Sequence, residues 1–116
     1  MTLYEPEVEV NGTTYKAKTP KAVVDILEAS RINRQRIRIF YGDVDTGRDW
    51  GDRPMRGRIG RSTGISKIPL LISNSRSTGG EGILDHCIIR IEESKGGRVL
   101  YQVGEKPRFT NFFNLP

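Results

Sequence analysis

This chain of 116 residues has little of what many catalytic and secreted proteins need: one cysteine, one histidine and no long hydrophobic run. Cys87 has no second cysteine for an internal disulfide, and with His86 it forms a pair too small to be a metal-ligand set. The N-terminus lacks the basic end and apolar stretch of a signal peptide, and nothing reaches the length of a membrane span. We expect a cytoplasmic protein with no metal, no cofactor and no membrane partner.

A catalytic set is equally hard to find. Asp85 precedes His86 in an expected strand, which would point the two side chains to opposite faces and prevent an orienting pair. Four acids could bind a divalent cation or act as acid and base, namely Asp43, Asp45, Asp49 and Asp52. Because Arg48 and Arg53 are interleaved with them, ion pairing in a solvated loop is the preferred interpretation. We expect no catalytic residues and no enzyme activity.

Positive charge is concentrated in the middle of the chain. The net charge is +5, and residues 31–67 hold nine arginines and one lysine against four acids. Arginine binds planar or bidentate partners such as phosphate better than lysine does. The plainer alternative is a solubilising basic face.

The N-terminal third has clear local signals. Residues 7–10 alternate in polarity, Asn11-Gly12 suits a type I′ turn, and the alternation resumes over residues 13–17, which predicts a hairpin. Thr19-Pro20 reads as an N-cap followed by proline in the first turn, so we expect a helix from about Pro20 to Ile32.

Further strands are separated by long loops. Residues 36–41 alternate as a strand, with Ile37, Ile39 and Tyr41 on one face. Residues 42–67 show no pattern beyond a short strand at Arg58-Ile59, which predicts a long functional loop.

The C-terminal half begins with a buried strand at 68–73, in which Pro69 requires an edge or a strand start. Residues 83–92 and 98–103 predict a second hairpin around Gly96-Gly97, and the phenylalanine-rich end of the chain should dock on this subunit or on a neighbour. Residues 1–116 thus form a single α+β domain. It has a mainly antiparallel sheet of five or six strands, one helix and long Gly/Arg-rich loops.

The tetrapeptide Arg-Ser-Thr-Gly occurs at 61–64 and again at 76–79. Guanidinium, hydroxyl and exposed backbone N–H groups are the parts of an anion cradle, although each copy could equally be a turn with a solvated arginine. If 68–73 is one strand, the copies lie roughly 20 Å apart at its two ends, so they form two sites or one site completed by a second subunit. The low apolar fraction, 35%, also favours a homo-oligomer.

Trp50, and also Phe109 or Tyr41, could stack on a nucleobase, although a buried tryptophan that anchors the loop is an alternative. The candidate ligand-binding residues are Arg48, Trp50, Arg61, Ser62, Thr63, Asn74, Arg76, Ser77 and Thr78.

Segments 39–43, 46–50, 59–64 and 74–80 together resemble small proteins carried by phages and plasmids, among them the Thoeris anti-defence "sponge" family. The resemblance covers roughly residues 36–91. It implies an oligomer in the host cytoplasm that sequesters cyclic ADP-ribose-type immune signals, and cyclic oligonucleotides too, without cleaving them.

Two function classes therefore compete. The first is non-enzymatic capture of a small phosphorylated nucleotide signal. The alternative is a nucleic-acid-binding or protein-inhibitor module that uses the basic stretch from Arg31 to Arg61 as a backbone-contacting patch. An enzyme that uses the Asp-rich loop with a metal is a third possibility.

Overall fold

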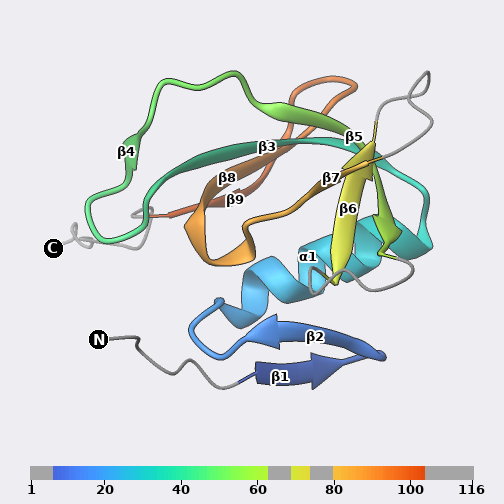
Figure 1. Ribbon diagram of the computed structural model, residues 1–116. Helices are drawn as coiled ribbons and strands as arrows, with labels where there is room; N and C mark the ends of the chain where they lie inside the picture. Colours follow the sequence, from blue (N-terminus) through green and yellow to red (C-terminus); the bar gives the residue numbers. More distant parts are fainter. Residues whose placement is uncertain (1–6, 63–68, 74–79, 104–116) are drawn as a thin grey trace, which may run out of the picture.

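The computed structural model describes residues 7–62, 69–73 and 80–103 (Figure 1). It begins with the predicted hairpin, strands β1 (Glu7–Val10) and β2 (Thr13–Lys16), paired antiparallel with Val10 opposite Thr13. Asn11 and Gly12 adopt φ values of 52° and 78°, the positive angles of a type I′ turn. The prediction of this hairpin is confirmed.

Helix α1 (Lys21–Ile32) follows and packs between the hairpin and the main sheet. Its apolar spacing predicts burial of Val23, Ile26 and Leu27; Val23 and Leu27 are buried, together with Val24, whereas Ile26 is only partly buried. The predicted cap is wrong, because Pro20 occupies the N-cap position and no side chain caps the helix. Thr19 lies one residue too early, and its hydroxyl is buried with no hydrogen-bond partner among the described residues.

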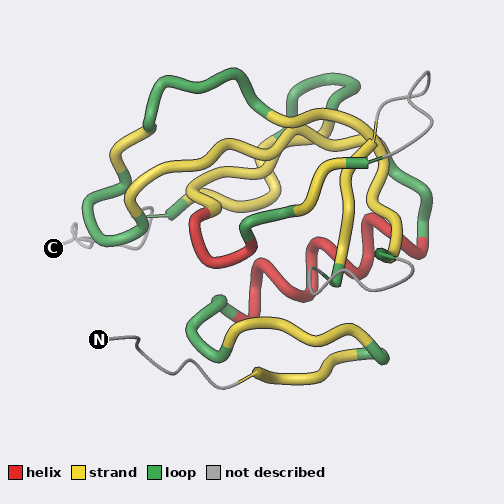
Figure 2. The backbone as a smooth tube through the Cα atoms, viewed as in Figure 1, coloured by secondary structure: helices red, strands yellow, loops and turns green. Residues whose placement is uncertain are grey.

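The main sheet has seven strands, in the order β7-β6-β5-β3-β8-β9 with β4 paired to β3, and every pairing is antiparallel (Figure 2). The α+β class with one helix in the described residues is confirmed. The strands are β3 (Arg36–Asp43), β4 (Arg48–Asp49), β5 (Met55–Arg61), β6 (Leu70–Ser73), β7 (Glu81–Gly82), β8 (Ile88–Glu93) and β9 (Val99–Gln102).

The predicted patternless loop over 42–67 is wrong, because it contains β4 and β5. In β5 the buried positions are Gly57 and Ile59, and they alternate with the exposed Arg56 and Arg58. A glycine at an inward position carries no hydrophobic signal, which hides the alternation from the sequence. At Gly42 a Cβ would lie 2.2 Å from the Arg48 carbonyl oxygen, so glycine lets β4 approach β3.

The strand predicted over 83–92 starts later than expected. A 3-10 turn, η1 (Asp85–Cys87), precedes β8, and a bulge between Phe40 and Tyr41 adjusts the pairing with β3. The β8–β9 hairpin itself is confirmed, with positive φ at Gly96 and Gly97. β6 begins directly after Pro69, which confirms the proline at a strand start.

The core lies between the sheet and α1. Ile37, Ile39 and Ile91 are fully buried against the helix side chains. The helix also buries one acid, Glu28, which accepts hydrogen bonds from Tyr15, Thr13 and Arg31. Within the described ranges, no helix combines the length and apolar character required to cross a membrane.

Candidate functional site

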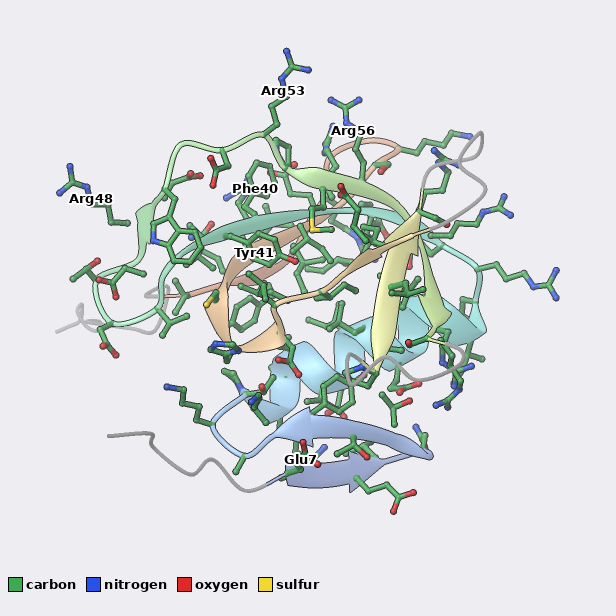
Figure 3. All side chains as sticks on the ribbon, in the orientation of Figure 1. Glu7, Phe40, Tyr41, Arg48, Arg53 and Arg56 are labelled. Atoms are coloured by element: carbon green, nitrogen blue, oxygen red, sulfur yellow. The ribbon has the colours of Figure 1, made fainter. Side chains whose placement is uncertain are left out.

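Two predicted ligand residues, Arg48 and Trp50, lie at the rim of the sheet. Both are exposed, and the Arg48 side chain extends away from the sheet (Figure 3). Trp50 is 52% exposed, so it is not the buried anchor considered as the alternative. Its backbone N–H donates to the Tyr41 carbonyl at 3.3 Å, which fixes the end of β4 beside β3.

Arg61 has a structural role in this state. Its guanidinium donates to the Thr13 hydroxyl and, at 2.6 Å, to the Asn11 carbonyl. Since Thr13 also bonds Glu28, Arg61 connects β5 to the hairpin and to the helix. The Ser62 backbone N–H donates to the Pro69 carbonyl at 3.1 Å, which places Ser62 at the start of β6.

The remaining predicted ligand residues, Thr63, Asn74, Arg76, Ser77 and Thr78, lie outside the described residues, as does Phe109. The described neighbours show how the two tetrapeptides are separated. Arg61 pairs with Leu70, the first residue of β6, and the second copy follows Ser73, its last residue.

The structure instead brings together arginines on the sheet face opposite α1. In the β3–β5 ladder Arg36 lies directly opposite Arg58, and Arg38 lies directly opposite Arg56. Ile37 and Ile39, between them, point into the core. We call Arg36, Arg38, Arg56 and Arg58 the arginine quartet.

Most of this quartet has no ion-pair partner in the part of the chain that the structure describes. Arg38 bonds Glu92 at 3.0 Å, whereas Arg36, Arg56 and Arg58 have no side-chain partner among the described residues. Within the same part of the chain, the Arg38 Nε is buried and has no partner either. Like charges directly opposite in a sheet destabilise it by up to about 1 kcal/mol per pair. This face therefore carries a cost that an anion would relieve.

An aromatic ring completes the face. Phe40 follows the quartet along β3, and the Arg90 guanidinium lies 5.9 Å from its ring centroid. Arg90 in turn contacts Glu92 and Gln102, both at 2.5 Å. Figure 3 shows Phe40, Arg53 and Arg56 on the side of the sheet away from α1.

Tyr41 lies on the helix side instead. Burial raises its pKa to about 12, and its hydroxyl accepts a hydrogen bond from the Leu84 N–H at 3.0 Å. It therefore acts as a structural contact between β3 and the segment before η1.

The predicted separation of Asp85 and His86 is wrong. Because they lie in a 3-10 turn and not in a strand, Asp85 Oδ1 and His86 Nδ1 approach to 3.6 Å. Burial raises the pKa of Asp85, and the neighbouring His86 opposes this shift, although 3.6 Å is too long for a hydrogen bond between them. His86 also lines a cavity of about 470 Å³ with Tyr101 and Val103. Among the described residues, no group of three or more His, Cys, Asp or Glu is arranged to hold a metal ion.

The sequence held a signal for the quartet. Arg36-Ile37-Arg38 and Arg56-Gly57-Arg58 share the pattern Arg-x-Arg, which places both arginines on one face of a strand. The first lies in the strand predicted over residues 36–41, whereas the short strand predicted at Arg58-Ile59 leaves out Arg56, so the sequence alone does not predict the pairing.

Comparison of the chain with protein families, characterised proteins and solved structures finds no match.

Proposed function

We propose that this protein binds a phosphorylated nucleotide without transforming it, and that the arginine quartet holds the phosphates. The observation that carries the proposal is the pairing of Arg36 with Arg58 and of Arg38 with Arg56 on an open sheet face. Guanidinium groups bind phosphate oxygens bidentately, and charge-assisted hydrogen bonds of this kind are roughly twice as strong as neutral ones.

The charge balance supports a bound anion. Glu92 engages Arg38 and Arg90 at one side of the quartet, while Arg56 and Arg58 stay exposed at the other. A phosphate over Arg56 and Arg58 would replace repulsion between neighbouring cations by attraction to both.

Phe40 supports a nucleotide over inorganic phosphate. Phe40 lies two residues after Arg38 on the same face of β3, which at a rise of about 3.3 Å per residue places it next to the quartet along the strand. A nucleobase stacked on an aromatic side chain contributes about 1–3 kcal/mol and needs no particular base. Trp50, exposed at the rim, offers a second stacking surface.

The ligand we propose is the small signalling nucleotide that the family resemblance implies, of the cyclic ADP-ribose type or a cyclic oligonucleotide. Capture without cleavage then amounts to sequestration. A second copy of the chain would supply further phosphate contacts, as expected for a homo-oligomer.

Nucleic acid is a second candidate, and one observation favours it. The positive charge extends beyond the quartet to Arg53, which precedes β5 and projects from the same side of the sheet (Figure 3). Proteins that bind single strands combine such a basic surface with stacking aromatics.

Native mass spectrometry separates these candidates from each other and from an enzyme. The protein is incubated with cyclic ADP-ribose isomers and cyclic di- and trinucleotides, then denatured, and the released species is identified. We expect an intact nucleotide released from a defined oligomer. A cleaved product would contradict binding without chemistry.

The salt dependence of binding affinity provides a second test that separates the two candidates. Binding to a polyanion through many phosphates falls steeply as salt rises, whereas binding of a ligand with two phosphates falls much less. An oligonucleotide that binds with a steep salt dependence, together with no captured small nucleotide, would replace the first candidate by the second.

A further inference from the structure

An apolar groove separates the N-terminal hairpin from α1. Val8 and Val10 of β1 line one side, Val24 of α1 lines the other, and the cavity measures about 390 Å³. Lys21 and Asp25 form an exposed ion pair at its rim. Val8 is 45% exposed although it lies on the strand face that carries the buried Tyr15. Val24 is only 5% exposed, so it forms the floor of the groove, and Val8 is the exposed apolar side chain at its edge.

A buried hydroxyl in the same groove lacks a partner. Thr19 lines the cavity and is only 8% exposed, and its Oγ1 forms no hydrogen bond within the described part of the chain. A buried polar group left unsatisfied costs about 1–3 kcal/mol. A chain segment in the groove could satisfy this hydroxyl with a backbone group.

The outer edge of β1 is acidic, and none of the described strands pairs with it. Val10 and Val8 face Thr13 and Tyr15 across a two-residue turn, so the backbone groups of Glu7 and Glu9 point to the unpaired side. Both glutamates are exposed. This charge disfavours pairing of β1 with a second β1 and favours a basic segment instead.

One segment of the chain has the complementary character. Residues 104–116 hold two cations, Lys106 and Arg108, against one acid, Glu105, and continue with four large apolar side chains, Phe109, Phe112, Phe113 and Leu115. The cations match Glu7 and Glu9, and the aromatic side chains match an apolar groove.

The described chain leads towards this groove. Val103, its last residue, lines the 470 Å³ cavity together with Lys18 and Pro20. Ala17 and Thr19, which alternate with them, line the groove. The two cavities therefore flank one short loop, and thirteen residues can extend up to roughly 40 Å. The groove is within reach in the same molecule.

We propose that residues 104–116 dock in the groove between β1 and α1 of their own chain. Their phenylalanines pack beside Val8, Val10 and Val24, and Lys106 and Arg108 pair with the acidic edge of β1. The segment then fixes the hairpin on the helix. This inference is independent of the nucleotide-binding proposal, because the groove and the arginine quartet lie on different sides of the molecule.

Disulfide trapping in the full-length chain tests this docking. Val8→Cys is combined with Phe112→Cys in a Cys87→Ala background, and the control combines Ile32→Cys with the same two changes. Ile32 is also exposed, at 61%, but it lies at the far end of α1. We expect an intramolecular disulfide that forms about tenfold faster in the Val8 variant, because docking raises the local concentration of residue 112. Equal rates, or a disulfide that joins two chains only, would overturn the proposal.

A second experiment introduces no cysteines, so it tests the proposal even if the cysteine variants fold poorly. Methyl NMR spectra are compared between the native chain and a Phe109→Ser/Phe112→Ser/Phe113→Ser variant. Loss of the aromatic rings should shift the methyl signals of Val8, Val10 and Val24 and leave those of Ile72, in β6, unchanged. Unshifted groove signals would overturn the proposal equally.

Discussion

The two faces of the β3–β5 pair differ sharply in polarity. Towards α1 the ladder presents Ile37, Ile39 and Ile59, all at most 6% exposed. Towards the outside the same strands present four arginines in direct opposition. The inner face stabilises the fold by removing apolar area from water. The outer face opposes the fold, because like charges directly opposite one another repel.

The treatment of charge sharpens this contrast. On α1, where it faces the hairpin, the buried Glu28 carboxylate accepts hydrogen bonds from three donors. On the outer face, the single acid Glu92 serves Arg38 and Arg90 and leaves the rest of the quartet unneutralised within the described residues. The buried charge of Glu28 therefore has hydrogen-bond partners, whereas the accessible positive charge of the quartet exceeds the negative charge of the described acid beside it.

The largest effect is expected from Glu28→Gln. Burial alone would raise the pKa of Glu28, but the hydrogen bonds from Thr13, Arg31 and Tyr15 outweigh it and lower the pKa. The ionised form therefore stabilises the fold above the unfolded-state pKa of about 4.3, and this stability is lost as pH falls through the lower folded-state pKa. We expect the variant to lose about 1–3 kcal/mol at neutral pH.

Urea denaturation between pH 3 and pH 7 measures this loss. Asp25→Asn, which removes the exposed ion pair with Lys21, is the matched control and should change stability by less than about 0.5 kcal/mol. If the two variants lost the same free energy of unfolding, the buried Glu28 carboxylate would contribute no more to stability than an exposed ion pair does.

Much of the inner face could be predicted from sequence, and the outer face could not. The alternation at Ile37 and Ile39 and the helical spacing of Val23 and Leu27 are direct signals of burial. β5 lacks this signal because Gly57 occupies an inward position. The short strand predicted at Arg58-Ile59 leaves Arg56 in a loop, so the sequence does not predict that Arg56 and Arg58 share a sheet face.

The predicted ligand-binding residues also show what could not be predicted from the sequence. Arg48 and Trp50 are accessible as expected, but sequence gives no sign that Arg61 reaches the hairpin fifty residues earlier. That contact depends on a tertiary arrangement in which β5 and the Asn11-Gly12 turn lie side by side. Asn74 and Arg76, with the other loop residues outside the described ranges, stay predictions.

A smaller effect is expected on the outer face from Glu92→Gln, which should strengthen binding. The substitution releases Arg38 and Arg90 from their ion pairs and raises the positive potential of the face. We expect nucleotide affinity to increase by about two- to tenfold at low salt. Isothermal titration calorimetry measures the change, and Glu93→Gln, which releases the exposed Arg98, is the control. A decrease in affinity would mean that Glu92 itself contacts the ligand.

The smallest effect concerns stability. Arg36→Thr removes one member of a like-charged pair, so the free energy of unfolding should rise by a few tenths of a kcal/mol at low salt. The gain should vanish at high salt, where the repulsion is screened. Thermal denaturation at two salt concentrations, with Arg53→Thr as the control, detects it. A stability loss at low salt would show that the pair is not a source of strain.

The most direct test of the central claim compares two single charge removals, Arg58→Gln and Lys21→Gln, in nucleotide binding. Both lower the net charge by one. Arg58 belongs to the quartet, whereas Lys21 lies on the helix, 87% exposed. Loss of a charge-assisted phosphate contact predicts about tenfold or greater weakening for Arg58→Gln and little change for Lys21→Gln. Equal weakening of both variants would contradict a phosphate site on the arginine quartet.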